Sequence, residues 1–118
     1  MNKIEKLLPD TLRLVKENLA DENEFIEPVY KGYISSFGAG IIQNGLLPTL
    51  MMYMGNDDKK LLFDVIYEVF KLHHAGVDSD LLRYVLKNKN DYSSLTDEIM
   101  NISVAVKLAI RTFNLDKQ

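Results

Sequence analysis

The helical spacing of apolar residues is the feature that most constrains this chain. Near the C-terminus they recur every three or four positions, at Ile99, Ile102, Val106, Ile110 and Phe113, which places them on one side of an α-helix. The sequence shows no apolar–polar alternation of the kind that indicates a β-strand, and no internal repeat. We therefore predict an all-α fold, a single compact bundle of five to six helices.

The same spacing predicts buried stripes in earlier helices. We expect Pro9 to stand in the first turn of the N-terminal helix or at a kink. The expected stripes are Ile4, Leu8, Leu12, Val15 and Leu19 in a first helix, Ile26, Tyr30, Tyr33, Phe37 and Ile41 in a second, and Leu62, Ile66, Val69, Phe70 and His73 in a later one.

Polar and glycine residues mark the expected helix ends. Asn44-Gly45 followed by Leu46 predicts the end of one helix, with the glycine at positive φ. Asp78 or Ser79 is expected to open a later helix. Ser94, three residues before Asp97, predicts a capping box at the start of the last helix.

Length and composition exclude several classes of protein. A chain of 118 residues is expected to form one domain, residues 1–118. It contains no Cys, which excludes disulfides and thiolate metal sites. It has no apolar run long enough to span a membrane and no secretory signal, so we expect a cytoplasmic protein without a membrane partner.

The charge is mildly acidic and unevenly distributed. The net charge is -3, and residues 1–30 hold seven Asp or Glu against four Lys or Arg. Residues 31–118 hold ten of each. A free-standing nucleic-acid-binding protein is usually basic, so the balance does not indicate one, although a local basic surface is compatible with it.

Motifs for catalysis or metal binding are not found. His73-His74 is the only histidine pair, and adjacent helical residues point about 100° apart, which is unfavourable for sharing one ion. We expect His73 at the edge of the core and His74 in solvent. Gly38-Ala39-Gly40 lacks the spacing of a phosphate loop and is interpreted as a close helix contact. The sequence therefore predicts no enzyme, no cofactor, no metal site and no small-molecule substrate.

Three methionines allow two interpretations. Met51, Met52 and Met54 lie in a short apolar segment, and methionine is common both in cores and on adaptable binding surfaces. Core filling is the favoured interpretation, and a surface for a protein partner is the alternative.

An ordered set of residues resembles a known family. Tyr30-Lys31-Gly32-Tyr33 precedes Ile41-Ile42-Gln43-Asn44-Gly45-Leu46-Leu47, which is followed by Leu50-Met51-Met52-Tyr53 and, near the end, by Tyr92 and Thr96-Asp97-Glu98. Over about residues 25–113 this order resembles the small α-helical subunit of the type III-B CRISPR effector, the Cmr complex. Ile42 and Gln43 are neutral where members of that family often carry a basic residue.

The resemblance implies a non-catalytic role in antiviral defence. Its partners would be the other effector-complex subunits, further copies of itself stacked as a short filament, and the guide and target RNA. Contacts to RNA would go to phosphates and so be independent of sequence. On this basis we hypothesise that Lys31, Ser35, Lys107 and Arg111 form one basic strip, which Ser103 and Asn114 extend.

Two other functions remain open from the sequence. One is a generic helical adaptor that binds a protein through an apolar surface and has no RNA partner. The other is a small enzyme or metal-binding bundle, against which the missing motifs argue.

Overall fold

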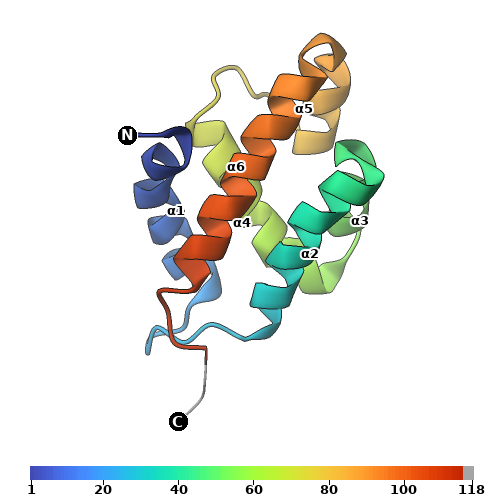
Figure 1. Cartoon of the computed structure of the whole chain (residues 1–118). Helices are drawn as coiled ribbons and strands as arrows, with labels where there is room; N and C mark the ends of the chain where they lie inside the picture. Colours follow the sequence, from blue (N-terminus) through green and yellow to red (C-terminus); the bar gives the residue numbers. More distant parts are fainter. Residues whose placement is uncertain (116–118) are drawn as a thin grey trace.

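The computed structural model, which describes residues 1–115, confirms the all-α prediction (Figure 1). Its elements are α1 (Lys3–Leu19), α2 (Val29–Asn44), α3 (Leu46–Met54), the 3-10 helix η1 (Asp57–Lys59), α4 (Lys60–Leu72), α5 (Leu81–Lys87), the 3-10 helix η2 (Lys89–Asp91) and α6 (Tyr92–Ile110). Within residues 1–115 the β-type pairing is limited to two isolated bridges, Ala20 with Ile26 and Phe25 with Asn114.

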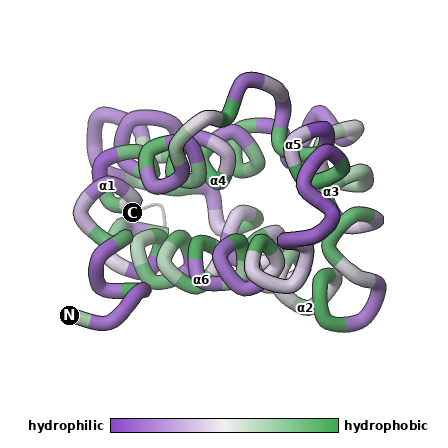
Figure 2. The backbone as a smooth tube through the Cα atoms, turned by 90° about the horizontal axis from the view of Figure 1, so that it is seen from above, coloured by the Kyte–Doolittle hydropathy of each residue, from purple (hydrophilic) through white to green (hydrophobic). Residues whose placement is uncertain are grey.

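Helix α6 is the centre of the bundle. It packs against α1, α2 and α4, while α3 and α5 pack together at one end (Figure 1). Hydrophobic and hydrophilic colours alternate along the helices in Figure 2, as expected for helices with one buried side. No helix in residues 1–115 has both the length and the apolar composition needed to cross a membrane.

The core is built mainly from α4 and α6. The stripe predicted for α6 is confirmed at its first four positions, which are at most 2% exposed, whereas Phe113 lies beyond the helix and is half-buried. The fully buried large side chains are Phe37, Phe70, Ile26, Ile34, Leu46, Leu50, Leu62, Ile66, Leu81, Leu95, Ile99 and Ile110.

The stripe predicted for the first helix was partly wrong. The Asn2 side chain accepts a hydrogen bond from the Glu5 amide, and this capping box sets where α1 begins. The buried face then runs through Leu7, Thr11, Leu14, Val15 and Leu19, and Leu12 is 37% exposed. Pro9 stands inside α1 rather than in its first turn.

Three predicted helix starts also differ from the structure. Ile26 lies in the segment before α2, where it pairs with Ala20, although it is fully buried as predicted. Helix α5 is capped by Asp80, whose side chain accepts from the Arg83 amide, one or two residues after the positions predicted. Helix α6 already begins at Tyr92, so Ser94 lies inside it and the predicted capping box does not form.

Candidate nucleic-acid interface

Helices α2 and α6 run antiparallel, side by side along one face of the bundle (Figure 1). The chain just before α2 is fastened to the chain just after α6. The Asn114 amide donates to the Glu24 carbonyl at 3.0 Å, and the Ile26 amide donates to the Asn114 carbonyl at 2.8 Å. The start of α2 and the end of α6 are therefore fixed at the same end of the molecule.

Small residues let the two helices approach closely. A Cβ added to Gly38 would lie 3.7 Å from the Ser103 hydroxyl, which is van der Waals contact. Ser103 is 4% exposed and donates to the Met100 carbonyl at 2.7 Å. The predicted close helix contact is thus confirmed, and the expectation that Ser103 extends an exposed polar face was wrong because α2 covers it.

The predicted cationic residues follow from this contact along both helices. Counted from Gly38, Ser35 lies about one turn and Lys31 about two turns nearer the start of α2. Counted from Ser103, Lys107 lies about one turn and Arg111 about two turns nearer the end of α6. Since the helices are antiparallel, both directions lead to the same end. Lys31, Ser35 and Arg111 are exposed, and Lys107 is half-buried. We call these four residues the cationic strip.

The strip has unpaired charge in the described chain. Within residues 1–115, Lys31, Lys107 and Arg111 form no ion pair. Lys107 lies in the last turn of α6 and Arg111 at its C-cap, where cations interact favourably with the helix dipole. That interaction gives these two residues a structural role and leaves their donors directed to solvent or a ligand.

An acidic loop lies at the same end of the molecule. Asp21, Glu22, Glu24 and Glu27 are exposed in the segment between α1 and α2. The Asp21 carboxylate accepts from two backbone amides of its own loop, and Glu24 pairs loosely with Lys16 at 3.8 Å. These carboxylates lower the net positive charge at this end of the molecule, and salt screens exposed charges over about 10 Å.

The Asn44–Gly45–Leu46 motif joins α2 directly to α3. Gly45 has φ 97° and ψ 163°, which confirms the predicted positive φ. This conformation is more extended than the left-handed helical one expected, and it is essentially restricted to glycine. The following amide, of Leu46, donates to the Tyr92 hydroxyl at 3.1 Å, so the joint is also fastened to the start of α6.

The tyrosines that carry the family resemblance have packing roles. Tyr53 donates its hydroxyl to the Tyr33 carbonyl at 2.6 Å, and the Lys59 ammonium lies 5.4 Å and 4.8 Å from the ring centres of Tyr33 and Tyr53. Burial raises the pKa of Tyr53, and burial with the neighbouring Tyr33 raises the pKa of Tyr30. These residues fix the position of α2 against α3.

The methionine prediction holds for one residue of three. Met54 is half-buried against the core, whereas Met51 and Met52 are 61% and 62% exposed. On the adjoining helix Ile42 is 76% exposed. The interpretation as core filling was therefore wrong for Met51 and Met52, which lie on the surface.

The two histidines have the opposite of their predicted environments. His74 is the more enclosed, because its ring stacks on Phe70 at 4.8 Å and contacts Glu98 at 3.0 Å and Tyr84 at 2.7 Å. His73 is exposed and pairs with Asp10 at 2.9 Å. Burial raises the pKa of Tyr84, and the ring nitrogens Nδ1 and Nε2 of His74 lie within hydrogen-bond distance of Glu98 and Tyr84.

Sequence reasoning missed this histidine network. The partners of His74 lie 10 and 24 residues away, and that of His73 lies 63 residues away. Helical spacing reports only neighbours within one or two turns. The adjacent histidines were the only signal, and their partners depended on the fold.

Comparison with known proteins identifies a family. The model of the family described as CRISPR-associated protein (Cas_Cmr5) matches residues 9–111, which include the cationic strip and the Asn44–Gly45–Leu46 motif. Neither the curated proteins nor the solved structures give a match.

Proposed function

This chain belongs to the Cas_Cmr5 family of CRISPR-associated proteins, subunits of the Cmr complex, and we propose that it is the small subunit that lines the guide–target RNA path. The family match over residues 9–111 is the observation that carries this proposal. In the complex, copies of the chain stack as a short filament beside the other subunits. The role is non-catalytic and belongs to antiviral defence in the cytoplasm.

The cationic strip supports the RNA contact. Lys31, Ser35, Lys107 and Arg111 offer donors without carboxylate partners in residues 1–115, along two helices whose register is fixed. Lysine and arginine donors recognise phosphates irrespective of base identity. A mildly acidic chain gains little RNA affinity alone, so we expect the strip to act when stacking places several copies side by side.

Exposed apolar residues favour a second candidate function. Ile42 lies in the last turn of α2, Met51 and Met52 lie in α3, and all three are exposed. Lys31 and Ser35 of the strip lie in the first half of α2. An apolar surface of this kind suits a protein partner. The alternative is therefore a helical adaptor that joins proteins and does not contact RNA.

Charge reversal in the strip tests the proposal. We expect Lys107→Glu with Arg111→Glu to weaken RNA retention in the reconstituted complex. The slope of log affinity against log salt should fall by about 2, one for each lost phosphate contact. Retention is measured by filter binding over a salt series. Thermal unfolding verifies that the variant folds, and we expect only a small loss of stability, from the lost interactions of Lys107 and Arg111 with the helix dipole.

A matched control variant changes the net charge by the same amount as the Lys107/Arg111 variant. Lys60→Glu with Lys89→Glu reverses two exposed lysines outside the strip and should leave the salt slope unaltered. Unchanged retention in the Lys107/Arg111 variant would exclude this face. A complex that assembles and retains this chain with no RNA present in any preparation would favour the adaptor.

A further inference from the structure

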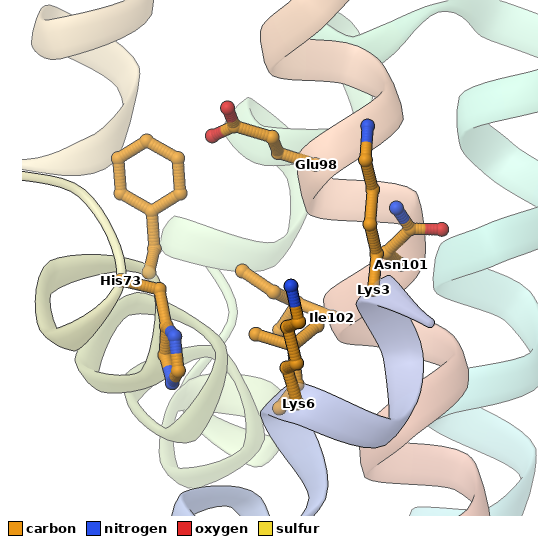
Figure 3. A pocket seen from close by; sticks show the side chains of 8 residues that line it. Lys3, Lys6, His73, Glu98, Asn101 and Ile102 are labelled. Atoms are coloured by element: carbon orange, nitrogen blue, oxygen red, sulfur yellow. The ribbon is translucent and has the colours of Figure 1, made fainter. Parts of the chain in front are cut away.

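A pocket of about 200 Å³ opens on the other side of α6, between α1, α4 and α6 (Figure 3). Leu7, Phe70 and Ile102 form its apolar floor. Each of the three is at most 7% exposed, so the packed core holds the floor in place. An apolar cavity of about 150 Å³ accommodates benzene, so this pocket has room for one aromatic or branched aliphatic side chain.

Polar groups from three helices surround the mouth. Lys3 and Lys6 extend from the first turns of α1, Glu98 and Asn101 from α6, and His73 from the end of α4 (Figure 3). Within residues 1–115 neither lysine has an ion-pair partner. The mouth therefore offers two ammonium groups that are complementary to carboxylates.

The remaining groups match a peptide backbone better than a nucleic acid. Glu98 is oriented by His74 at 3.0 Å and keeps acceptor capacity for an N–H group, while the Asn101 amide can both donate and accept. An RNA phosphate could pair with Lys3 and Lys6, but it has no apolar group to fill the space over Leu7, Phe70 and Ile102. The apolar floor offers such a phosphate no compensation.

We propose that this pocket binds a peptide segment of another protein, in which one large apolar side chain is flanked by Asp or Glu. The apolar side chain fills the space over Leu7, Phe70 and Ile102, and the acidic neighbours pair with Lys3 and Lys6. Both lysines precede residue 9, where the family match begins. The inference does not depend on the RNA contact.

A peptide titration tests the inference on the full chain. The probe is a blocked peptide of sequence Asp-Glu-Phe-Asp-Gly, added up to low-millimolar concentration while amide NMR signals are followed. We expect saturable shifts around Leu7, His73, Asn101 and Ile102. Replacing the peptide's Phe by Ala should weaken binding roughly tenfold to a hundredfold, because the buried apolar surface is lost.

Charge variants of the chain separate this site from the cationic strip. Lys3→Glu with Lys6→Glu should weaken the peptide roughly tenfold, whereas Lys107→Glu with Arg111→Glu should not change it. Both lysines are exposed, and thermal unfolding verifies that the variant folds. Absence of shifts, equal binding by the Lys3/Lys6 variant, or shifts of the same signals by a short RNA but not by the peptide would each overturn the inference.

Discussion

The two sides of α6 differ in the size of the side chains that meet there. Toward α2, Gly38 faces Ser103 and the helix backbones approach closely. Toward α1 and α4, large apolar side chains meet, and a pocket of about 200 Å³ remains between them. One side of α6 is thus a close contact between small residues, and the other side carries a pocket with large apolar side chains at its base.

Under the two proposals, similar charges on the two sides of α6 bind different partners. Each side carries cations that have no ion pair within residues 1–115, Lys107 and Arg111 on one side and Lys3 and Lys6 on the other. A surface that follows two helices suits the extended backbone of a nucleic acid. A hollow with an apolar floor suits one anchoring side chain, which contributes most of the affinity in such contacts.

We expect Gly45→Val to destabilise the fold more than the other substitutions at the α2 side of α6. Gly45 has φ 97° and ψ 163°, and an added Cβ would approach the Pro48 ring and the Tyr92 hydroxyl at 3.7 Å. A β-branched residue is strained there, and a shift of the joint would weaken the hydrogen bond from Leu46 to Tyr92. We expect the free energy of unfolding in urea to fall by about 3 kcal/mol.

A second glycine of α2 supplies the control. Gly32 is exposed, and nothing lies within 4 Å of an added Cβ. Gly32→Ala should therefore stabilise the chain, by about 0.5–1 kcal/mol, through helix propensity. A Gly45→Val variant as stable as the parent chain would show that the joint between α2 and α3 does not need this backbone conformation.

Gly38→Leu tests the close contact itself. An added Cβ at Gly38 would already lie at van der Waals distance, 3.7 Å, from the Ser103 hydroxyl, so we expect the larger side chain of leucine to crowd the contact. We expect overpacking to lower the free energy of unfolding by about 2 kcal/mol, measured by urea denaturation. Gly38→Ala should be neutral or slightly stabilising. If leucine were tolerated as well as alanine, the two sides of α6 would not differ in packing as described.

Local features of the fold could be predicted from the sequence. The stripe of α6, the joint at Gly45 and the glycine contact at Gly38 depend on residues within one or two turns, or on a glycine-only conformation. The strip residues could be proposed because their positions on the helices follow from the same spacing. Ser103 was misassigned because its burial depends on where α2 packs.

Features that need distant partners could not be predicted. The pocket is lined by residues from the first turns of α1, the end of α4 and the middle of α6, and helical spacing gives no register between these segments. The face of α1 was shifted because packing against α4 and α6 decides which face is buried, and that face includes Leu7, Thr11 and Leu14. Leu12 is apolar by composition, but the phase of the helix places it at the surface.

Among Gly45→Val, Gly38→Leu and His74→Ala, we expect His74→Ala to have the smallest effect on stability, and it tests the side of α6 that carries the pocket. His74 joins the end of α4 to Tyr84 and Glu98, and its loss removes two hydrogen bonds and a stacked contact with Phe70. We expect a loss of about 1–2 kcal/mol in thermal or urea unfolding. His73→Ala is the matched control, because its exposed pair with Asp10 is worth about 0–1 kcal/mol. A larger loss for His73→Ala than for His74→Ala would mean that the pair with Asp10, and not the enclosed network that orients Glu98, holds α4 in place beside the pocket.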